Sequence, residues 1–348
     1  MTRVASTVAI AGFGRFGRAL ADLLIEAGAA VRAFDPAADV PGPLRAADPA
    51  ALVEDADVVV VATPIGEIAD ALTALRPHLT GDQLVIDVGS VKRGPVAAMT
   101  EVLGAGIPWA ATHPLFGPLN IARGERPLRA VVCPNDLHPE AAGRARRLYE
   151  QIGCLVIEQD ADEHDRLMAR THALAFFVAK GLIDIGAGDD LPFAPPSFQA
   201  LAQTIDTVRS DAGHLFLAIE RDNPHAEDAR QGLLDALTRV HTGLDEAAPI
   251  PAGAAPLTIP EAPGGPELVE TRDLIDEIDA GIVELLARRR HLSARACRIK
   301  SEQGAGIRVA AREMSLLDDR RRRAAELGLS EETVADVFAA ILRFSRAA

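Results

Sequence analysis

The sequence predicts an α/β domain with a doubly wound parallel sheet, followed by an all-α domain and by a separate, all-α three-helix domain at the C-terminus. Two changes of pattern along the 348 residues support this order. Short β-branched runs alternate with helix-like segments over residues 1–158, whereas residues 159–245 have helical periodicity alone. A proline-rich linker, 246–266, then separates the last domain, 267–348.

The first domain is expected to hold a sheet of buried strands. Each predicted strand is a short apolar run, and the segments between the runs are helix-like, as in the crossover connections of a parallel sheet. The predicted strands are 7–11, 30–34, 57–62, 84–87, 109–112, 130–133 and 154–157, with a helix near 139–152 before the last of them. This rhythm predicts a parallel sheet.

The second domain is expected to be helical throughout. Helical periodicity covers 162–187, 197–221 and 224–245, and prolines interrupt it between these segments. The linker that follows has six prolines in 21 residues and little to bury, which is typical of a semi-extended spacer.

The C-terminal domain is expected to begin with one long helix. Apolar residues recur at three- and four-residue spacing over 267–304 without a proline. A helix of about 35 residues spans roughly 50 Å, too long to be buried by the 82 residues of one chain, so we expect partner helices in a homodimer. Shorter helices are predicted near 308–327 and 330–346, the latter with Ser330 in its N-terminal cap region.

The composition is typical of a folded protein in a reducing cytoplasm. Hydrophobic residues make up 48% and charged residues 25% of the chain, which argues against disorder throughout. The apolar runs fall short of the roughly 18 residues of a membrane span, and the run at 8–13 is too short for a signal sequence. Cys133, Cys154 and Cys297 lie far apart, so we expect neither a disulfide framework nor a metal site.

The net charge of −14 resides in the first 266 residues, because the last 82 contain 15 basic and 15 acidic side chains. A strongly acidic body argues against nucleic acid as a partner. Small anionic substrates are compatible with it, since a few local arginines can outweigh a distant charge that salt screens within about 10 Å.

A glycine loop opens the first helix. Its residues are Gly12, Phe13, Gly14, Arg15, Phe16 and Gly17. The loop lies between a predicted strand and a predicted helix, and Asp35 ends the second strand, 23 residues after Gly12. This context predicts a dinucleotide site, in which Gly12 makes the tight turn, Gly14 admits the pyrophosphate and Gly17 lets the helix pack closely. Asp35 would accept hydrogen bonds from the ribose hydroxyls and repel a 2′-phosphate, which favours NAD over NADP. The alternative interpretation of the glycine loop is a βα turn that binds no ligand.

Further candidate site residues stand at other strand ends, where a doubly wound sheet binds its ligands. Thr63 and Pro64 end the third strand and suit a loop along the cofactor, although a plain turn is the alternative. Ser90 follows the fourth strand and His113 ends the fifth, both on the expected nicotinamide side. An imidazole there can take a proton from a hydroxyl as hydride leaves the same carbon, and Ser90 can hydrogen-bond that hydroxyl or the histidine. The alternative for His113 is a structural role.

Five motifs occur along residues 7–245: GFGRFG, VVVATP, DVGSVK, THPLFGP and the EHD of 163–165. In this order they resemble the prephenate/arogenate dehydrogenase family. The resemblance implies a Rossmann domain, a helical dimerisation domain, and NAD(P)-dependent oxidative decarboxylation of a cyclohexadienol to a phenol. It also implies that His113 is the catalytic base, that Ser90 is its hydrogen-bonding companion, and that His164 and His172, eight residues apart, border the site.

One substrate-binding position departs from the bacterial members of this family. There, an arginine nine residues before the aromatic residue of a turn binds the side-chain carboxylate of the substrate. Aligning that turn with 211–216 places Thr207 at the arginine's position, and Arg209, two residues later, is the candidate replacement. Residues 198–226 resemble the plant-type arogenate dehydrogenases, which also lack the arginine, so a ketoacid and an amino acid side chain both remain open.

Basic residues recur along the predicted C-terminal helices. TRDLIDEID, LLARRRHLSARACRIK and IRVAARE resemble the all-helical chorismate mutase family over almost all of 267–348. By position, the resemblance implies that Arg272, Arg289 and Arg312 hold the two carboxylates of chorismate, with Arg272 reaching across from the other subunit. The remaining implied substrate contacts are Lys300 at the ether oxygen, Glu313 at the ring hydroxyl, and Arg308.

Two departures from the mutase pattern bear on activity. Val309 stands where the family often has an acid. The sequence ends at Ala348, one residue before the position of a Gln or Glu that partners the lysine, although Ser345 is present.

Together the resemblances predict two successive reactions. The C-terminal domain would convert chorismate to prephenate, and the N-terminal unit would oxidise prephenate to 4-hydroxyphenylpyruvate with NAD, as in tyrosine biosynthesis. One alternative is the same pair of steps on 4-amino-4-deoxychorismate and its prephenate analogue. Another is an arogenate dehydrogenase whose mutase-like domain binds an aromatic effector without catalysis.

Overall fold

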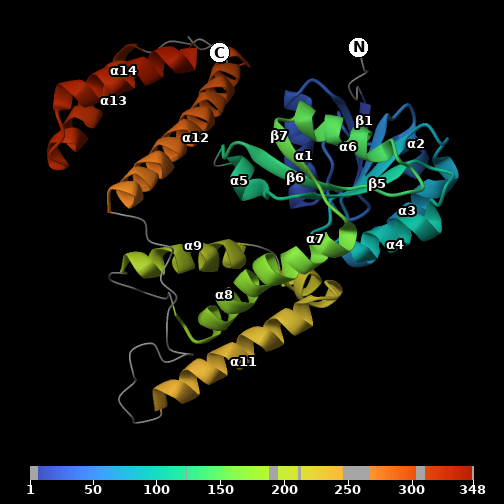
Figure 1. The fold of residues 1–348 in the computed structure, drawn as a ribbon. Coiled ribbons are helices and arrows are strands. Elements are labelled where there is room, and N and C mark those ends of the chain that lie inside the picture. Colours follow the sequence, from blue (N-terminus) through green and yellow to red (C-terminus); the bar gives the residue numbers. More distant parts are fainter. Residues whose placement is uncertain are drawn as a thin grey trace. The chain divides into compact units, whose positions relative to one another are not determined.

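In the computed structural model, the short β-branched runs form one sheet (Figure 1). The structure describes residues 7–122, 124–187, 195–210, 213–245, 267–302 and 310–346, so the predicted linker lies outside the described residues. The strands are β1 (Thr7–Ala11), β2 (Ala30–Phe34), β3 (Val58–Val61), β4 (Leu84–Asp87), β5 (Trp109–Pro114), β6 (Leu128–Cys133) and β7 (Cys154–Glu158). They lie in the order β2-β1-β3-β4-β5-β6-β7, and each predicted strand agrees with its counterpart to within two residues at either end.

The prediction of a parallel sheet is wrong at β6, which runs antiparallel to β5. Strands β1 to β5 are parallel to one another, and β7 is parallel to β6. Between β5 and β6, the described residues form only the short helix α5 (Pro118–Ala122), which is too little for the helical crossover that a parallel pair requires. The chain therefore turns back at the edge of the sheet where β5 ends, close to His113.

Helices cover both faces of the sheet. They are α1 (Arg15–Glu26), α2 (Pro49–Val53), α3 (Ile68–Leu75), α4 (Arg93–Val102) and α6 (Ala141–Gln151), with 3₁₀ turns η1 (Ile65–Glu67) and η2 (Arg76–His78). Val59, Val85 and Trp109 belong to one apolar cluster with side chains of α2, α3 and α4. Val60 and Ile86 point to the opposite face and are also fully buried. Burial on both faces explains why the strands are almost uniformly apolar.

The second domain contains two π-helical turns, η3 (Ala169–Ala173) and η4 (Ala218–Asp222). The α-helices around them are α7 (Ala161–Met168), α8 (Leu174–Asp184), α9 (Pro196–Ser210), α10 (Gly213–Leu217) and α11 (Ala226–Asp245). Ala173, Phe176 and Ile219 form a buried cluster where η3, α8 and η4 meet. The predicted helices 162–187 and 197–221 are therefore not regular, because a π-turn accommodates one extra residue that a 3.6-residue period does not reveal.

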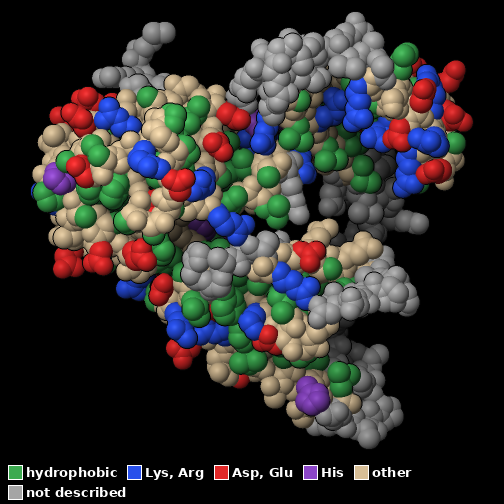
Figure 2. Space-filling model, turned by 180° about the vertical axis from the view of Figure 1, so that it is seen from behind, with side chains coloured by type: hydrophobic (Ala, Val, Ile, Leu, Met, Phe, Trp, Pro, Cys, Tyr) green, Lys and Arg blue, Asp and Glu red, His purple; other side chains and the backbone are tan. Residues whose placement is uncertain are grey.

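The chain divides into two compact units, and the second comprises residues 261–348 with the segment 119–127. Its helices α12 (Glu267–Glu302), α13 (Ala310–Glu326) and α14 (Glu331–Arg346) agree with the prediction, and Ser330 Oγ accepts the backbone N–H of Thr333 at 3.3 Å. Figure 2 shows hydrophobic side chains beside charged ones on these helices. On α12, four apolar side chains are 48–65% exposed, namely Ile278, Ile282, Val283 and Leu285. Among the described residues, no helix is long and apolar enough to cross a membrane.

A buried ion pair supports the carboxyl edge of the sheet. The side chains of Lys92 and Asp87 are fully buried, and Lys92 Nζ donates to Asp87 Oδ2 and to the carbonyl oxygen of Thr112. Asp87 also accepts the backbone N–H groups of Gly89 and Thr112, at 2.8 and 2.9 Å. These bonds fix the end of β4 to the residue that precedes His113.

We expect Lys92→Met to destabilise the first unit by about 3–5 kcal/mol, because it leaves the Asp87 carboxylate buried without its cation. Trp109 is the single tryptophan and is buried in the sheet domain, so its fluorescence during urea unfolding follows this unit. Lys180→Met is the matched control, since Lys180 pairs with Asp184 on the surface and its loss costs less than about 1 kcal/mol. Equal losses in the two variants would contradict a stabilising role for the buried pair.

Candidate functional site

The glycine loop between β1 and α1 is a tight turn with one open position. Gly12 has φ of +99°, and a Cβ there would lie 2.6 Å from the backbone of Ala62. A Cβ on Gly17 would lie 2.3 Å from the carbonyl oxygen of Gly12. Apart from Gly14 itself and its neighbours along the chain, no described atom lies within 4 Å of a Cβ built on Gly14. The dinucleotide interpretation requires this combination of close packing at Gly12 and Gly17 with open space at Gly14.

The side chains of the loop fasten it to its surroundings. Phe13 is buried, and the guanidinium of Arg18 lies 5.0 Å from its ring centroid. Phe16 packs toward the THPLFGP segment, with its ring centroid 5.9 Å from that of Phe116. Arg15 is exposed on the first turn of α1. The Phe16–Phe116 contact therefore brings the predicted cofactor loop to the segment that carries His113.

Asp35 follows β2 and accepts three backbone N–H groups. The donors are Phe13 at 2.6 Å, Ala37 at 2.8 Å and Ala38 at 2.8 Å. Burial is the largest effect on the pKa of Asp35 and raises it, but the three backbone donors and the charge of Arg18 outweigh it, so the pKa is lower than usual. The ionised carboxylate lines a cavity of about 440 Å³ formed by residues 34–40 and 45–47. A negative charge at this place suits a ribose with a free 2′-hydroxyl.

Two buried hydroxyls at strand ends, Thr63 Oγ1 and Ser90 Oγ, have no hydrogen-bond partner among the described residues. An unpaired buried hydroxyl costs free energy, so such groups mark places that a ligand can complete. Thr63 lies against the glycine loop, its backbone N 2.9 Å from a Cβ built on Gly12, and Pro64 precedes the turn η1. Ser90 does not bond His113 in the structure. The tight glycine loop and the unpaired Thr63 hydroxyl fit a bound NAD.

His113 begins a chain of buried hydrogen bonds that crosses from β5 to α7. His113 Nδ1 lies 2.9 Å from His164 Nε2, and His164 Nδ1 lies 2.9 Å from Asp165 Oδ1. The side chains of His164 and Asp165 are fully buried. Asp165 also accepts the backbone N–H groups of Lys92 and Arg93, at 2.7 and 2.9 Å. The chain of hydrogen bonds thus runs from the start of α4 to His113 Nδ1. His113 Nε2 takes no part in it.

His172, on the π-turn η3, lies on the other side of His113. The two ring centroids are 6.4 Å apart and the ring planes differ by 14°, while Phe176 packs its ring edge-on to His172 at 4.7 Å. Burial, with a smaller effect of His164, lowers the pKa of His172 to about 4. Burial also holds the pKa of His113 well below its ordinary value, and His164 and Lys92 add to this effect. Both imidazoles are therefore neutral at neutral pH, as a general base must be.

Sequence reasoning placed His113, His164 and His172 near one another but gave no role to Asp165 or Asn223. Asn223 Nδ2 donates to the backbone carbonyl of Asp165 at 2.8 Å, which ties the start of α11 to α7. The EHD motif was the available signal for Asp165. Arg209, the candidate cation for the substrate side chain, is exposed on the last turn of α9, and the side chain of Thr207 lies outside the described residues.

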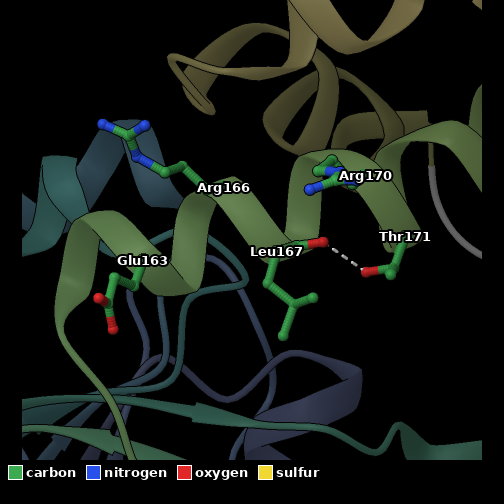
Figure 3. Close-up of a pocket in the computed structure, with 5 residues that line it drawn as sticks. All are labelled: Glu163, Arg166, Leu167, Arg170 and Thr171. Atoms are coloured by element: carbon green, nitrogen blue, oxygen red, sulfur yellow. Dashed lines mark hydrogen bonds between the residues drawn. The ribbon is translucent and has the colours of Figure 1, made fainter.

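A further cavity of about 540 Å³ lies along the exposed face of α7 and η3 (Figure 3). Its lining residues are Glu163, Arg166, Leu167, Arg170 and Thr171. Arg166 is engaged with Asp162 at 2.8 Å. Because His164 and Asp165 are buried whereas the lining side chains are exposed, this cavity is separate from the hydrogen-bond chain, and we place the candidate site at His113.

In the second unit, the structure shows a contact of the predicted substrate-binding residue Arg289. Arg289 on α12 donates to Ser345 Oγ on α14, and its guanidinium lies 3.5 Å from the carbonyl oxygen of Ile341. On α13, Arg312 is exposed and Glu313 is half-buried. The side chains of Arg272 and Lys300, and all of Arg308 and Val309, lie outside the described residues. The contact of Arg289 brings together two helices that the mutase resemblance requires to share a site.

Comparison with protein families finds three matching regions. Residues 42–158 match the nucleotide-binding domain of prephenate dehydrogenase, and residues 271–348 match chorismate mutase type II. Residues 3–73, which contain the glycine loop, match the NAD-binding domain of D-isomer specific 2-hydroxyacid dehydrogenases. The cofactor expectation, NAD, agrees with these matches.

Individual relatives match parts of the chain. A probable arogenate/prephenate dehydrogenase of Methanocaldococcus jannaschii is 25% identical over 51% of this chain and 42% of its own length. The T-protein of Haemophilus influenzae is 36% identical over 36% of this chain and 32% of its own length. The chain thus spans less than half of either relative. A crystal structure of prephenate dehydrogenase from A. aeolicus has the same fold, with a TM-score of 0.57, 18% identity, and coverage of 81% of this chain and 100% of that one.

We expect Gly14→Ala to fold normally but to bind NAD at least about tenfold more weakly, because the added methyl occupies the space that a pyrophosphate needs. Calorimetric titration with NAD measures the affinity, and Trp109 fluorescence during urea unfolding checks the fold. Gly17→Ala is the comparison variant, since its Cβ would collide with Gly12 and should destabilise the unit itself. Unchanged NAD affinity in Gly14→Ala would argue for a βα turn without a ligand.

The low pKa of His172, about 4, makes the first unit less stable in acid. As the pH falls through about 6.5, the unfolded chain takes up a proton that the folded chain refuses, so the stability present above that pH is lost toward pH 4. We therefore expect the urea midpoint, followed by Trp109 fluorescence, to drop on acidification, and to drop less in His172→Gln. His78→Gln, on the surface, should behave as wild type. Parallel curves for His172→Gln and wild type would contradict this origin.

Proposed function

Because the chain combines the nucleotide-binding domain of prephenate dehydrogenase with a type II chorismate mutase domain, we propose that it is a bifunctional enzyme of aromatic amino acid biosynthesis. The C-terminal domain would rearrange chorismate to prephenate. The N-terminal unit would then decarboxylate prephenate oxidatively to 4-hydroxyphenylpyruvate. The observation that carries the dehydrogenase assignment is the buried His113 at the carboxyl end of β5, in a chain of hydrogen bonds with His164 and Asp165.

In the proposed dehydrogenase reaction, the glycine loop and Asp35 would hold NAD, which would supply the hydride acceptor for the ring carbon that bears the hydroxyl. His113 Nε2 takes the hydroxyl proton as that carbon becomes a carbonyl. The bond between the ring and its carboxylate then breaks, CO₂ leaves, and the electron pair stays in the ring, which becomes aromatic. The phenolate oxygen takes the proton back from His113. Ser90, whose hydroxyl has no partner among the described residues, would hydrogen-bond the same oxygen.

The proposed mutase reaction makes different demands. It is a pericyclic rearrangement, so the protein contributes restraint of the reactive conformer and cations where negative charge grows. Arg289, Arg312 and Arg272 are the proposed carboxylate partners, and their planar guanidinium groups suit two-point binding. Lys300 is proposed at the ether oxygen, with Glu313 and Arg308 at the rest of the substrate. The contact between Arg289 and Ser345 supports a site between α12 and α14.

The enzyme is proposed to act as a homodimer in the cytoplasm. On α12 the apolar residues Ile278, Ile282, Val283 and Leu285 are 48–65% exposed, which a second copy would cover. Burying four such side chains contributes several kcal/mol, at about 1.5–3 kcal/mol for each one fully buried. The cysteines are free thiols, two of them buried, which suits a reducing compartment.

A second candidate function, arogenate dehydrogenase, is favoured by the position of Thr207 and Arg209 and by the arogenate/prephenate relative. Prephenate carries a ketoacid side chain, whose carboxylate has no positive charge beside it. Arogenate carries an amino acid side chain, in which an ammonium group stands beside the carboxylate. An arginine that binds the side-chain carboxylate is therefore less needed for arogenate. The hydroxyl-bearing ring and the chemistry at His113 are the same for both. A ring with an amino group, as in 4-amino-4-deoxyprephenate, is the remaining alternative.

One assay of the full chain tests these proposals together. NADH formation is measured with prephenate, arogenate and 4-amino-4-deoxyprephenate side by side, and separately with chorismate. We expect prephenate to give the highest kcat/KM, and chorismate to give NADH because the mutase supplies prephenate. A preference for arogenate would assign the second candidate function. Failure of all three dehydrogenase substrates would refute the dehydrogenase proposal, and failure of chorismate alone would make the C-terminal domain non-catalytic.

In the same assay, we expect His113→Asn to lower the turnover of prephenate by about 10²–10⁴-fold, the usual cost of losing a general base. NAD affinity should be unchanged, because the glycine loop and Asp35 are not altered. Consumption of chorismate by the same variant is the control, since the C-terminal domain does not use His113. Turnover close to that of wild type would remove His113 from the mechanism.

A further inference from the structure

We propose that Asp165 and His164 are positioning residues that hold His113 as its Nδ1–H tautomer, so that Nε2 carries the lone pair for the proton of the substrate. The side chains of His113, His164 and Asp165 are 0–6% exposed and are joined by two contacts of 2.9 Å. The tautomer itself follows from the chain of donors and acceptors in the protein. Its use in catalysis rests on the proposed function.

Asp165 is the fixed end of the chain, because its surroundings leave it only as an acceptor. Its two oxygens receive the backbone N–H groups of Lys92 at 2.7 Å and Arg93 at 2.9 Å, at the start of α4. With N–H donors against both of its oxygens, the carboxylate acts as the acceptor in this chain of hydrogen bonds. An ionised carboxylate has no proton to donate. In the 2.9 Å contact with His164, the proton must therefore sit on His164 Nδ1.

The positions of the remaining protons on His164 and His113 follow from the rule that a neutral imidazole carries one proton. With that proton on Nδ1, His164 Nε2 can only accept. The 2.9 Å contact then requires a proton on Nδ1 of His113, and neutral His113 has its lone pair on Nε2. Without an acceptor at Nδ1, both tautomers of His113 would be open.

The other charged group near His113 does not compete for this role. Lys92 Nζ donates to Asp87 and to the carbonyl oxygen of Thr112, so its protons are engaged elsewhere. His172 contacts His113 through its ring, with the centroids 6.4 Å apart. When His113 takes a proton, the new positive charge forms next to an imidazole that is itself bonded to a carboxylate. The arrangement therefore selects the accepting nitrogen, as an Asp–His pair does in other enzymes.

The ligand-free full chain, labelled with ¹⁵N-histidine, allows the tautomers to be read directly by long-range ¹H–¹⁵N correlation at neutral pH. We expect His113 and His164 both to show a protonated Nδ1 and an unprotonated Nε2. His138 is an internal reference of the opposite kind, because its Nε2 donates to the carbonyl oxygen of Gly104 at 2.8 Å. Resonances are assigned from the signal lost in His113→Asn, His164→Gln and His138→Gln. A protonated Nε2 on His113 in the wild type would overturn the proposal.

A pair of variants at His164 then separates positioning from packing. The amide oxygen of His164→Gln can still accept from His113 Nδ1, whereas His164→Leu offers no acceptor. We expect His164→Gln to keep the Nδ1–H signal of His113 and to lose less than about tenfold in turnover. In His164→Leu the signal should shift toward protonated Nε2, and turnover should fall at least about tenfold further. Equal turnover in two folded variants would show that the acceptor at this position does not matter.

The two measurements keep this proposal apart from the proposed function. Should His113 have the expected tautomer while none of the three dehydrogenase substrates is oxidised, the positioning role stands and the proposed function fails. Should prephenate or arogenate be oxidised while His113 has its proton on Nε2, the proposed function stands and the positioning role fails. The tautomer spectra need no substrate, so either result is decisive for the chain of hydrogen bonds.

Discussion

The carboxylate of Asp165 is the contact through which the helical domain and the sheet domain share one site. This group accepts two backbone N–H groups at the start of α4 and one imidazole N–H of α7. Asn223 binds the backbone carbonyl of the same residue, so the segment that enters α11 is attached at the same point. A site that is divided between two domains needs such a junction, because the position of His172 relative to His113 depends on how α7 sits on the sheet.

Lys92 and Asp165, the charged residues described beside His113 and His164, both have hydrogen-bond partners. Lys92 is paired with Asp87, and Asp165 is held by N–H donors, while burial keeps the pKa of His113 and His172 below the ordinary value. An unpaired charge in this place would cost several kcal/mol. The proton that moves during the proposed reaction therefore enters surroundings whose charged groups are already engaged in hydrogen bonds.

Much of this architecture could be predicted from the sequence, since burial on both faces of a sheet leaves a clear apolar pattern. Strands such as 7–11 and 84–87 agree with β1 and β4, and the spacing from Gly12 to Asp35 marked the cofactor side. The reversal of β6 was missed because it depends on the short connection after β5 rather than on the strand itself. His113 and His164 are 51 residues apart, so their bond could not be derived from spacing. Asp165 was visible as part of a motif, but its partners on α4 come from tertiary packing.

The π-turn η3 changes how residue spacing relates to the faces of its helix. In a regular α-helix, the eight residues from His164 to His172 would leave about 80° between the two side chains. The extra residue held in the π-turn removes most of that angle, and both rings reach His113. A chain with one residue fewer in this stretch could form a regular helix and still present both histidines on one face. The turn thus has the form of an absorbed one-residue insertion, and relatives whose histidines are seven residues apart should be aligned with this chain as structural equivalents.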